Sequence, residues 1–324
     1  MASATAIAHP NIALIKYWGV RDDALNLPAS GSLSITLDGL ETRTRVTFDS
    51  TLPADTLELD GQTAKPQATA RASAHLDRIR HLAGSNVPAR VVSQNSFPTS
   101  AGIASSASGF AALTVAAAAA LGLDLSPKEL SILARKGSGS AARSIFGGFA
   151  EWHKGEDDPT SFAEQIWPPD HWDLVDWIAV VDRHPKLTGS HEGHRLASTS
   201  PLQETRVASA PERLDECRSA LMARDFQRLA AVVELDSHIM HAVMMTSFPP
   251  LLYWSAGSIQ LMKKVAGWRA EGIDVCYTLD AGPTVHCITT AEHASQVEAL
   301  LQSDADVLEL YRGVPGPPAH LVAS

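Results

Sequence analysis

The segment PTSAGIASSAS at residues 98–108 runs directly into an alanine-rich stretch at residues 109–123. Small residues followed by an apolar run predict a Gly/Ser loop that opens a helix. The first N–H groups of a helix lack internal partners and its dipole favours negative charge, so such a loop can hold phosphate groups. A Ser/Gly loop that only caps a buried helix has the same local sequence, and the segment alone leaves both interpretations open.

Length and charge limit the classes of protein to consider. With 324 residues the chain can bury a sizeable core, which favours two closely joined domains, although one large domain stays open. Its formal net charge is -10 and it shows no basic stripe, so nucleic acid is not expected as a partner. An acidic protein can still bind an anionic small molecule through a few local cations. We expect such a cluster to form from Lys16, Arg21, Lys136, Arg143 and Lys186.

Cysteine use and the N-terminus bear on the compartment. Cys217, Cys276 and Cys287 have neither the even number of a disulfide framework nor the spacing of a zinc site, which fits a reducing cytosol. The N-terminus lacks a basic region followed by an apolar one, and residues 110–123 are too few and too rich in alanine to span a bilayer. We therefore expect a soluble cytoplasmic protein with no membrane partner.

Apolar periodicity predicts strands mixed with helices along the whole chain, which favours an α+β fold over a regular βαβ array. Strands are expected over residues 5–18, 89–93, 177–181, 275–279 and 285–289, with a hairpin or meander over 33–48. Helices are expected over residues 65–82, 109–123, 126–135, 211–223, 226–244, 255–271 and 291–302. The segment 152–172 is expected to wrap the surface, and a domain boundary is expected near residue 180.

Three short motifs carry candidate chemistry. Lys16 ends the apolar run NIALIK, where a buried ammonium needs an ion pair or a ligand, whereas a surface lysine extends its end into water. In KGSGSAARS at residues 136–144, serine hydroxyls and the fork of Arg143 suit a second anion site, although a flexible helix connection has the same composition. In LDAGP at residues 279–283, Asp280 precedes a glycine turn and either enters a cleft or forms an Asx-turn.

The histidines give weaker signals. His184, Lys186 and His191 fall in one polar segment that a solvated loop explains equally well. His238 and His241 lack the accompanying carboxylate arrangement of a zinc site, so structural polar contacts are expected there.

Taken together, the motifs PTSAGIASSAS, HPNIALIKYWG, RKGSGSAARSIFGGFAEW and TLDAGP resemble the mevalonate diphosphate decarboxylases of the GHMP kinase superfamily, in that family's order. SHEGHRLASTSPL and HAVMMTSFPPLLYW extend the resemblance over nearly the whole chain. It implies a GHMP kinase fold, with a ribosomal protein S5 domain 2-like N-terminal domain over residues 1–180 and a ferredoxin-like α+β domain over 181–324. It also implies an active-site cleft between the domains and a homodimer.

The resemblance further implies the reaction. ATP, with Mg²⁺, phosphorylates the tertiary 3-hydroxyl of 5-diphosphomevalonate, and loss of that phosphate drives decarboxylation to isopentenyl diphosphate in the mevalonate pathway of isoprenoid biosynthesis. A 3-hydroxy acid has no carbonyl placed to accept the electrons left by carbon dioxide, so a leaving group must be made first. Neither PLP nor a redox cofactor is needed for that chemistry.

Carried onto this chain, the family pattern assigns roles by residue. Asp280 is the base or charge partner at the 3-hydroxyl, Lys16 organises it and the transferring phosphoryl group, and Arg143 holds the substrate carboxylate. The implied substrate-binding residues are Tyr17, Ser138, Gly139, Ser140, Arg143, Lys186 and His191. The implied ATP-binding residues are Pro98, Ser100, Ala101, Gly102, Ala104, Ser105 and Ser106, with Ser106 also assigned to Mg²⁺.

Two departures bear on the substrate. Val20 follows the YWG triplet where many diphosphate-using members show a lysine, and His191 stands where some members have an arginine that contacts the diphosphate. Fewer cations favour the phosphomevalonate decarboxylases, which use the 5-monophosphate, unless Arg21, Lys186 or Arg195 compensates.

A mevalonate 3-kinase and a non-catalytic binding protein are two further hypotheses. The related 3-kinases lack the aspartate, and a non-catalytic protein would be expected to lose at least one of the three catalytic residues, all of which this chain keeps.

Overall fold

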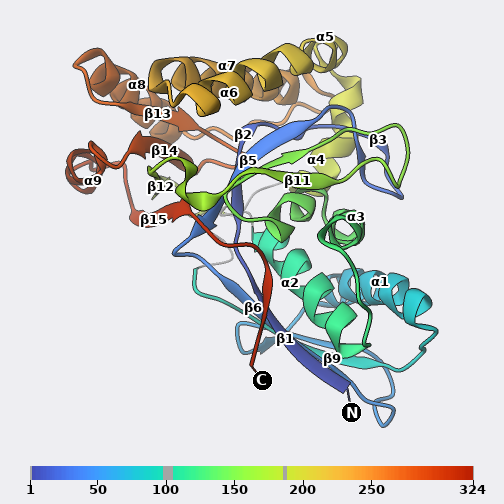
Figure 1. The fold of residues 1–324 in the computed structure, drawn as a ribbon. Coiled ribbons are helices and arrows are strands. Elements are labelled where there is room, and N and C mark those ends of the chain that lie inside the picture. Colours follow the sequence, from blue (N-terminus) through green and yellow to red (C-terminus); the bar gives the residue numbers. More distant parts are fainter. Residues whose placement is uncertain (1, 98–104, 185–187, 324) are drawn as a thin grey trace.

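The computed structural model describes residues 2–97, 105–184 and 188–323 of the chain. Strands form two main sheets, and helices pack against both of them (Figure 1). The predicted α+β class is confirmed. Both termini lie at the same end of the molecule, because the last strand pairs with the first (Figure 1).

The first sheet has six strands in the order β16-β1-β6-β9-β7-β8. These are β1 (Ala2–Ala8), β6 (Thr42–Phe48), β7 (Thr56–Leu59), β8 (Gln62–Thr63), β9 (Ala89–Asn95) and β16 (His320–Val322). Burial alternates along β6, so only one face is covered. That face packs on α1 (Pro66–Ala83), α2 (Ser105–Ala120) and α3 (Pro127–Gly137). The alanine side chains of α2 let it lie close against β1 and β6.

Local signals explain where these helices begin and end. Pro66 stands at the first position of α1, and Gly84 ends the helix with a positive φ of 62°. Ser126 and Glu129 form a capping box at the start of α3. After α3 the chain continues into the 3₁₀ helix η1 (Gly139–Ile145).

The second sheet has eight strands in the order β11-β10-β5-β15-β12-β14-β13, with β2 paired to β5. These are β2 (Asn11–Ile15), β5 (Ser32–Asp38), β10 (Phe149–Trp152), β11 (Ala163–Trp167), β12 (Leu174–Val180), β13 (Val275–Thr278), β14 (Val285–Thr290) and β15 (Glu309–Pro315). Helices α6 (Ala210–Ala223) and α7 (Phe226–Thr246) cover one face, and α8 (Ala256–Ala270) and α9 (Ala294–Gln302) cover the other. Strand β12 is therefore buried along its whole length.

Short elements complete the described chain. Strands β3 (Val20–Asp22) and β4 (Leu27–Pro28) pair with each other. The connection between β12 and α6 contains α4 (Ser190–Leu196), η3 (Ala197–Thr199) and α5 (Gln203–Ala208), and η2 (Pro169–His171) precedes β12. In the described part of the chain, none of the helices has the length and apolar character needed to cross a membrane.

Two predictions about the strands are wrong. The hairpin expected over 33–48 does not form, because β5 and β6 lie in different sheets. The single strand expected over 5–18 divides into β1 and β2, which also belong to different sheets. The segment 152–172 lies largely at the surface, as expected, and it also contains β11, an edge strand paired with β10.

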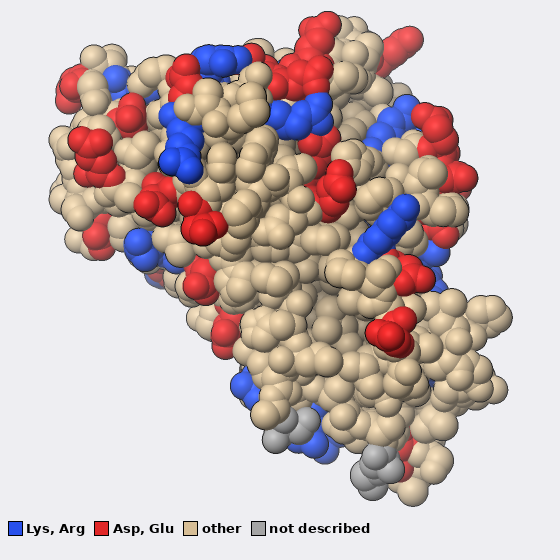
Figure 2. Space-filling view, viewed as in Figure 1, with Lys and Arg blue, Asp and Glu red and all other residues tan. Residues whose placement is uncertain are grey.

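The predicted helices and the remaining predicted strands are confirmed, with bounds shifted by a few residues. The late strands β15 and β16 return to pair with β5 and β1, and the sequence patterns did not predict them. The domain division near residue 180 stays a prediction. On the face shown in Figure 2, Lys and Arg residues are interspersed with Asp and Glu.

Candidate active site

Lys16 is the first residue after β2, where the chain leaves the sheet. Its side chain is 1% exposed, and its Nζ donates a hydrogen bond of 2.7 Å to Oδ1 of Asp280. The interpretation of Lys16 as a surface lysine is therefore wrong. The buried ammonium has the anionic partner that its burial requires.

Asp280 follows β13 and begins the turn that leads to β14. The N–H of Gly282 donates to the carbonyl of Asp280 at 2.7 Å. Among the described residues, no N–H group of this turn donates to the Asp280 carboxylate, which accepts from Lys16 instead. The side chain is 34% exposed, so it is open to a ligand. Burial raises the pKa of this carboxyl, whereas the charges of Lys16, His286 and Arg143 lower it, and the net shift is downward. Asp280 is an ionised carboxylate at neutral pH.

Arg143 lies in η1 with 2% of its surface exposed. Its guanidinium donates to the side-chain oxygens of Asn11 (3.0 Å), Ser34 (3.0 Å) and Ser32. Among the described residues it has no carboxylate within ion-pair distance. Burial lowers the pKa of Arg143 to about 10, against the opposing charge of Asp280, so the group stays protonated at neutral pH. A buried cation with neutral partners is suited to receive an anion.

Asn11 is a site residue that the sequence patterns did not single out. Its Oδ1 accepts from Arg143, and its Nδ2 donates to Ser140 O (3.1 Å) and Ser144 Oγ (2.8 Å). The side chain is 3% exposed at the start of an otherwise apolar strand. An amide in such a position needs buried partners, and that signal was available in the sequence.

The ring of Tyr17 stacks on His194, with centroids 4.0 Å apart, and is tilted against Trp152 at 4.7 Å. A Cβ at Gly139 would come within 2.6 Å of the Tyr17 ring, so the two residues touch. His194 was not predicted as a site residue. Its Nδ1 accepts from the N–H of Gly19 at 3.1 Å, and burial lowers its pKa to about 3, assisted by the charges of His191 and Arg206. His194 is neutral at physiological pH.

The serine-rich segment after α3 reaches the start of α2. Ser138 Oγ donates to Ser106 Oγ at 3.5 Å, which joins a predicted substrate residue to a predicted ATP residue. Ser105 and Ser106 also line a cavity of about 210 Å³ between α2, α1 and strands of the first sheet, with Phe110, Leu57 and Arg71 among its walls. Pro98, Ser100, Ala101, Gly102, Ala104 and Lys186 lie outside the described residues.

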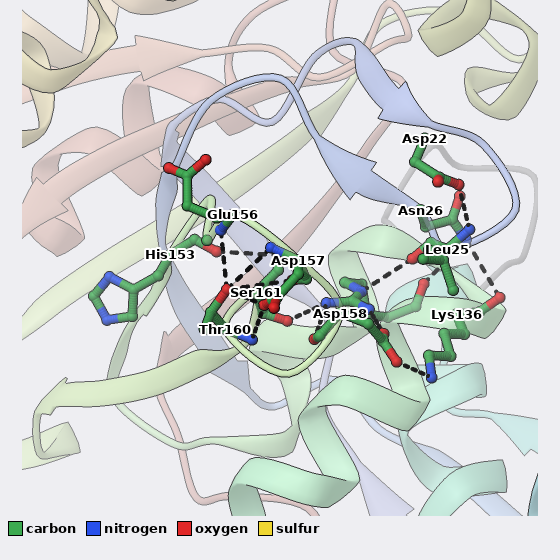
Figure 3. A network of polar contacts seen from close by, with 12 residues as sticks. Asp22, Leu25, Asn26, Lys136, His153, Glu156, Asp157, Asp158, Thr160 and Ser161 are labelled. Atoms are coloured by element: carbon green, nitrogen blue, oxygen red, sulfur yellow. Dashed lines mark hydrogen bonds and ion pairs between the residues drawn. The ribbon is translucent and has the colours of Figure 1, made fainter.

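The predicted cluster of cations forms only in part. Lys16 and Arg143 both act on the charge of Asp280. Arg21 instead donates to backbone oxygens of Pro28 and of residues 154–156. Lys136 Nζ binds Asp158 Oδ2 at 2.7 Å (Figure 3). These two cations hold the loop around Asp158, and the prediction that they join the cluster is wrong.

The remaining candidate histidines lie in the loop after β12, at the start of α4 and in α7. His191 is exposed at the start of α4, and His184 pairs with Asp182 at 2.6 Å with its side chain 92% exposed. His238 and His241 make the structural contacts that the sequence favoured, with Tyr277 Oη (2.9 Å) and Leu279 O (3.3 Å). In residues 2–97, 105–184 and 188–323, no cluster of three or more His, Cys, Asp or Glu could hold a metal ion.

Two family models match the chain. The diphosphomevalonate decarboxylase-like N-terminal domain matches residues 8–163, and the mevalonate 5-diphosphate decarboxylase C-terminal domain matches residues 177–310. The diphosphomevalonate decarboxylase of Aspergillus fumigatus is 42% identical, over 86% of this chain and 75% of its own length. The phosphomevalonate decarboxylase of Haloferax volcanii is 35% identical, over 97% of this chain and 96% of its own. The solved structure of MDDEF in complex with MVAPP, AMPPCP and magnesium is 40% identical, with a TM-score of 0.94 over 100% of this chain and 99% of that one.

Proposed function

This chain belongs to the mevalonate diphosphate decarboxylase family, and from that premise we propose that it decarboxylates 5-diphosphomevalonate with ATP to give isopentenyl diphosphate. The predicted GHMP kinase fold is confirmed by the likeness to the family's solved structures. The observation that carries the proposal is the Lys16–Asp280 ion pair beside the buried cation Arg143. The ion pair can orient a hydroxyl for phosphorylation, and Arg143 can bind a carboxylate.

The first step is phosphoryl transfer. The 3-oxygen of the substrate attacks the γ-phosphorus of ATP, the bond from that phosphorus to the β-bridging oxygen breaks, and ADP leaves. Asp280 orients the hydroxyl and receives its proton. Because its pKa is low, Asp280 is a weak base, so its proton transfer is expected to accompany bond formation to phosphorus rather than precede it. Lys16 stabilises negative charge that gathers on the transferring group.

The second step breaks two bonds. The phosphate leaves carbon 3 with the electron pair of the C–O bond, and the C1–C2 pair becomes the new double bond as carbon dioxide departs. The carboxylate loses its charge in this step, so Arg143 binds it best before the step and least after it. Its role is to fix the carboxylate during phosphoryl transfer. Its bonds to Asn11 and to two serines keep the guanidinium in place.

ATP is proposed to bind at the start of α2. Ser105 and Ser106 stand at the helix N-terminus, where unpaired N–H groups and the helix dipole favour phosphate, and the neighbouring cavity has an apolar wall for a base. Mg²⁺ fits this arrangement as an ion carried on the nucleotide phosphates, because it needs few protein ligands and the described residues supply no carboxylate cage. Ser106 is the protein group proposed to hold it, and the ion would neutralise charge on the transferring phosphate.

The second candidate function is decarboxylation of mevalonate 5-phosphate to isopentenyl phosphate. It is favoured because the described basic residues that could bind a second phosphate already have other partners. Val20 supplies no charge, Arg21 is bound to backbone carbonyls and Lys136 is paired with Asp158. Arg195 lies 3.5 Å from Asp23. A diphosphate needs more cationic partners than a monophosphate. The Haloferax relative, whose name gives the monophosphate substrate, also matches this chain over nearly its full length.

The assembly and location are proposed from the family alone. We assign the chain to a cytoplasmic homodimer, with domains at residues 1–180 and 181–324. The two family models support the division, since they end and begin on either side of residue 170.

The proposal is tested by incubating the protein with ATP, Mg²⁺ and each phosphorylated mevalonate at equal concentration. Release of both phosphate and carbon dioxide is the result expected of a decarboxylase, and the substrate with the higher kcat/KM identifies the number of phosphates. Release of ADP alone would identify a 3-kinase. No product at all from either substrate would mean a non-catalytic binding protein and would overturn the proposal.

A further inference from the structure

The main chain at Lys16 is held by charged side chains and not by a neighbouring strand. The N–H of Lys16 donates to Oδ2 of Asp236 at 2.6 Å, and Nη2 of Arg206 donates to the carbonyl of Lys16 at 2.6 Å. Asp236 lies in α7 and Arg206 in α5, so both partners come from a distant part of the sequence. The peptide groups on either side of the Lys16 Cα are therefore fixed where the ladder of β2 has ended.

A second set of bonds holds these partners. Nε of Arg213, in α6, donates to Oδ1 of Asp236 at 2.6 Å, and its Nη2 donates to the carbonyl of Arg206 at 3.0 Å. Nη1 of Arg206 and Nε2 of Gln203 both donate to the carbonyl of Trp18 at 3.1 Å. All four side chains are buried, and Asp236 is 0% exposed.

Stability alone does not account for this arrangement. Three buried charged groups carry a desolvation cost, and well-packed apolar residues often make a fold as stable or more stable. Among the described residues, Nε of Arg206 also has no hydrogen-bond partner, which adds to the cost. The network fixes the peptide groups on both sides of Lys16, whose ammonium binds Asp280, and apolar packing would not do this.

We propose that Asp236 and Arg206 are positioning residues that set the Lys16 ammonium on Asp280, with Arg213 holding Asp236 in place. The inference rests on the proposed function, because it assumes that this ion pair acts on the substrate. Different results would refute the proposed function and the positioning role. A wild-type protein without turnover refutes the function, whereas an active wild type with equally active variants refutes the positioning role.

A matched control lies between α6 and α7, the two helices that Arg213 and Asp236 join. Glu216 in α6 and Arg228 in α7 form an ion pair with two hydrogen bonds, of 2.8 and 2.7 Å. Both side chains of the control pair are 43% exposed. Glu216→Gln therefore removes a carboxylate between the same helices without touching the Lys16 peptide.

The test uses steady-state kinetics of Asp236→Asn, Arg206→Lys and Glu216→Gln. Asp236→Asn turns one acceptor into a donor facing either Lys16 N–H or Arg213, and kcat is expected to fall on the order of 100-fold while KM for ATP stays within about twofold. Arg206→Lys keeps the charge but loses the fork that reaches two carbonyls, and a loss of about tenfold is expected. Glu216→Gln should keep the wild-type kcat.

The pH profile separates positioning from a general structural defect. Lys16, His286 and Arg143 are the charged groups that lower the pKa of Asp280. If Lys16 moves away, that pKa rises, so the acid limb of kcat/KM should shift to higher pH in Asp236→Asn and Arg206→Lys but not in Glu216→Gln. Should Asp236→Asn fail to fold, Arg206→Lys decides the question. Wild-type kcat and an unmoved acid limb in the folded variants would overturn the proposal.

Discussion

Gly139→Ala is expected to damage substrate binding through one rigid contact. A Cβ at residue 139 would come within 2.6 Å of Cε1 of Tyr17 and within 2.8 Å of its Cζ and Oη. Ordinary contact begins at 3.4 Å, so the ring would have to move by nearly an ångström. It has little room to do so, because His194 stacks on it and Trp152 lies beside it.

Two opposing effects set the size of the change in stability. Overpacking of this kind costs about 1–3 kcal/mol, whereas replacing glycine by alanine stabilises by about 0.4–1 kcal/mol through the unfolded chain. The free energy of unfolding should therefore fall by about 0–2.6 kcal/mol, and by about 1.3 kcal/mol at the middle of both ranges. A displacement of about 1 Å at a site residue is enough to lower kcat/KM on the order of 100-fold. The loss should appear in KM for the phosphorylated mevalonate, since Tyr17 is assigned to that substrate.

The assay pairs urea unfolding with steady-state kinetics in both substrates. Gly267→Ala in α8 is the matched control, because no described atom outside its own helix lies within 4 Å of the added methyl group. That variant should be more stable by about 0.5–1 kcal/mol and fully active. The reasoning fails if Gly139→Ala keeps the wild-type KM for the phosphorylated mevalonate together with an unchanged or higher urea midpoint.

Further predictions follow from the charged groups. Asp280→Asn should abolish carbon dioxide release while nucleotide binding survives in a titration, and retained release would remove its catalytic role. Asp158→Ala leaves the fully buried Arg135 without its carboxylate partner, and we expect urea unfolding to show a loss of about 2–3 kcal/mol, less than for a fully buried pair because Asp158 is 32% exposed. Burial lowers the pKa of three histidines from 6.5 to about 3. Between these two pH values the unfolded chain binds more protons than the folded chain. The free energy of unfolding should therefore fall as pH drops from about 6.5 towards 3, by up to roughly 1.4 kcal/mol per pH unit for each histidine. They are His75, His194 and His241. His75→Gln should make this slope of urea stability against pH shallower, and an equal slope would contradict the argument.

The residue pattern predicted what kind of partner Lys16 needs, and the resemblance to a family named Asp280 as the group that Lys16 organises. An ammonium at the end of an apolar strand requires an anion once buried, and Asp280 stands in a motif that presents a carboxylate. The two lie 264 residues apart, and the tertiary structure brings them within 2.7 Å, with α7 contacting both β2 and β13. Periodicity describes one element at a time, so contacts between distant elements came from the resemblance to a family and not from the pattern.

The sequence pattern of β5 also misrepresents how that strand is buried. Serine or threonine alternates with leucine or isoleucine along β5, which is typical of a strand with one face in water. Both faces are in fact buried. Ser32 and Ser34 accept hydrogen bonds from Arg143, and the Thr36 hydroxyl donates to the carbonyl of Phe146. The polar face of β5 is thus covered by η1 and the chain directly after it, and a period-two pattern cannot distinguish water from a buried cation as the partner of a hydroxyl.

That polar face also explains why Arg143 differs from the other buried arginines of the described chain. Arg80, Arg135 and Arg213 each form an ion pair with an aspartate, and Arg206 directs its bonds at backbone carbonyls. Arg143 binds two hydroxyls and an amide, which leave its charge uncompensated. A serine oxygen that accepts from a guanidinium still has its own O–H to donate. Ser32 and Ser34 therefore orient the cation without neutralising it, and a ligand carboxylate that reaches Arg143 meets both its charge and further donors.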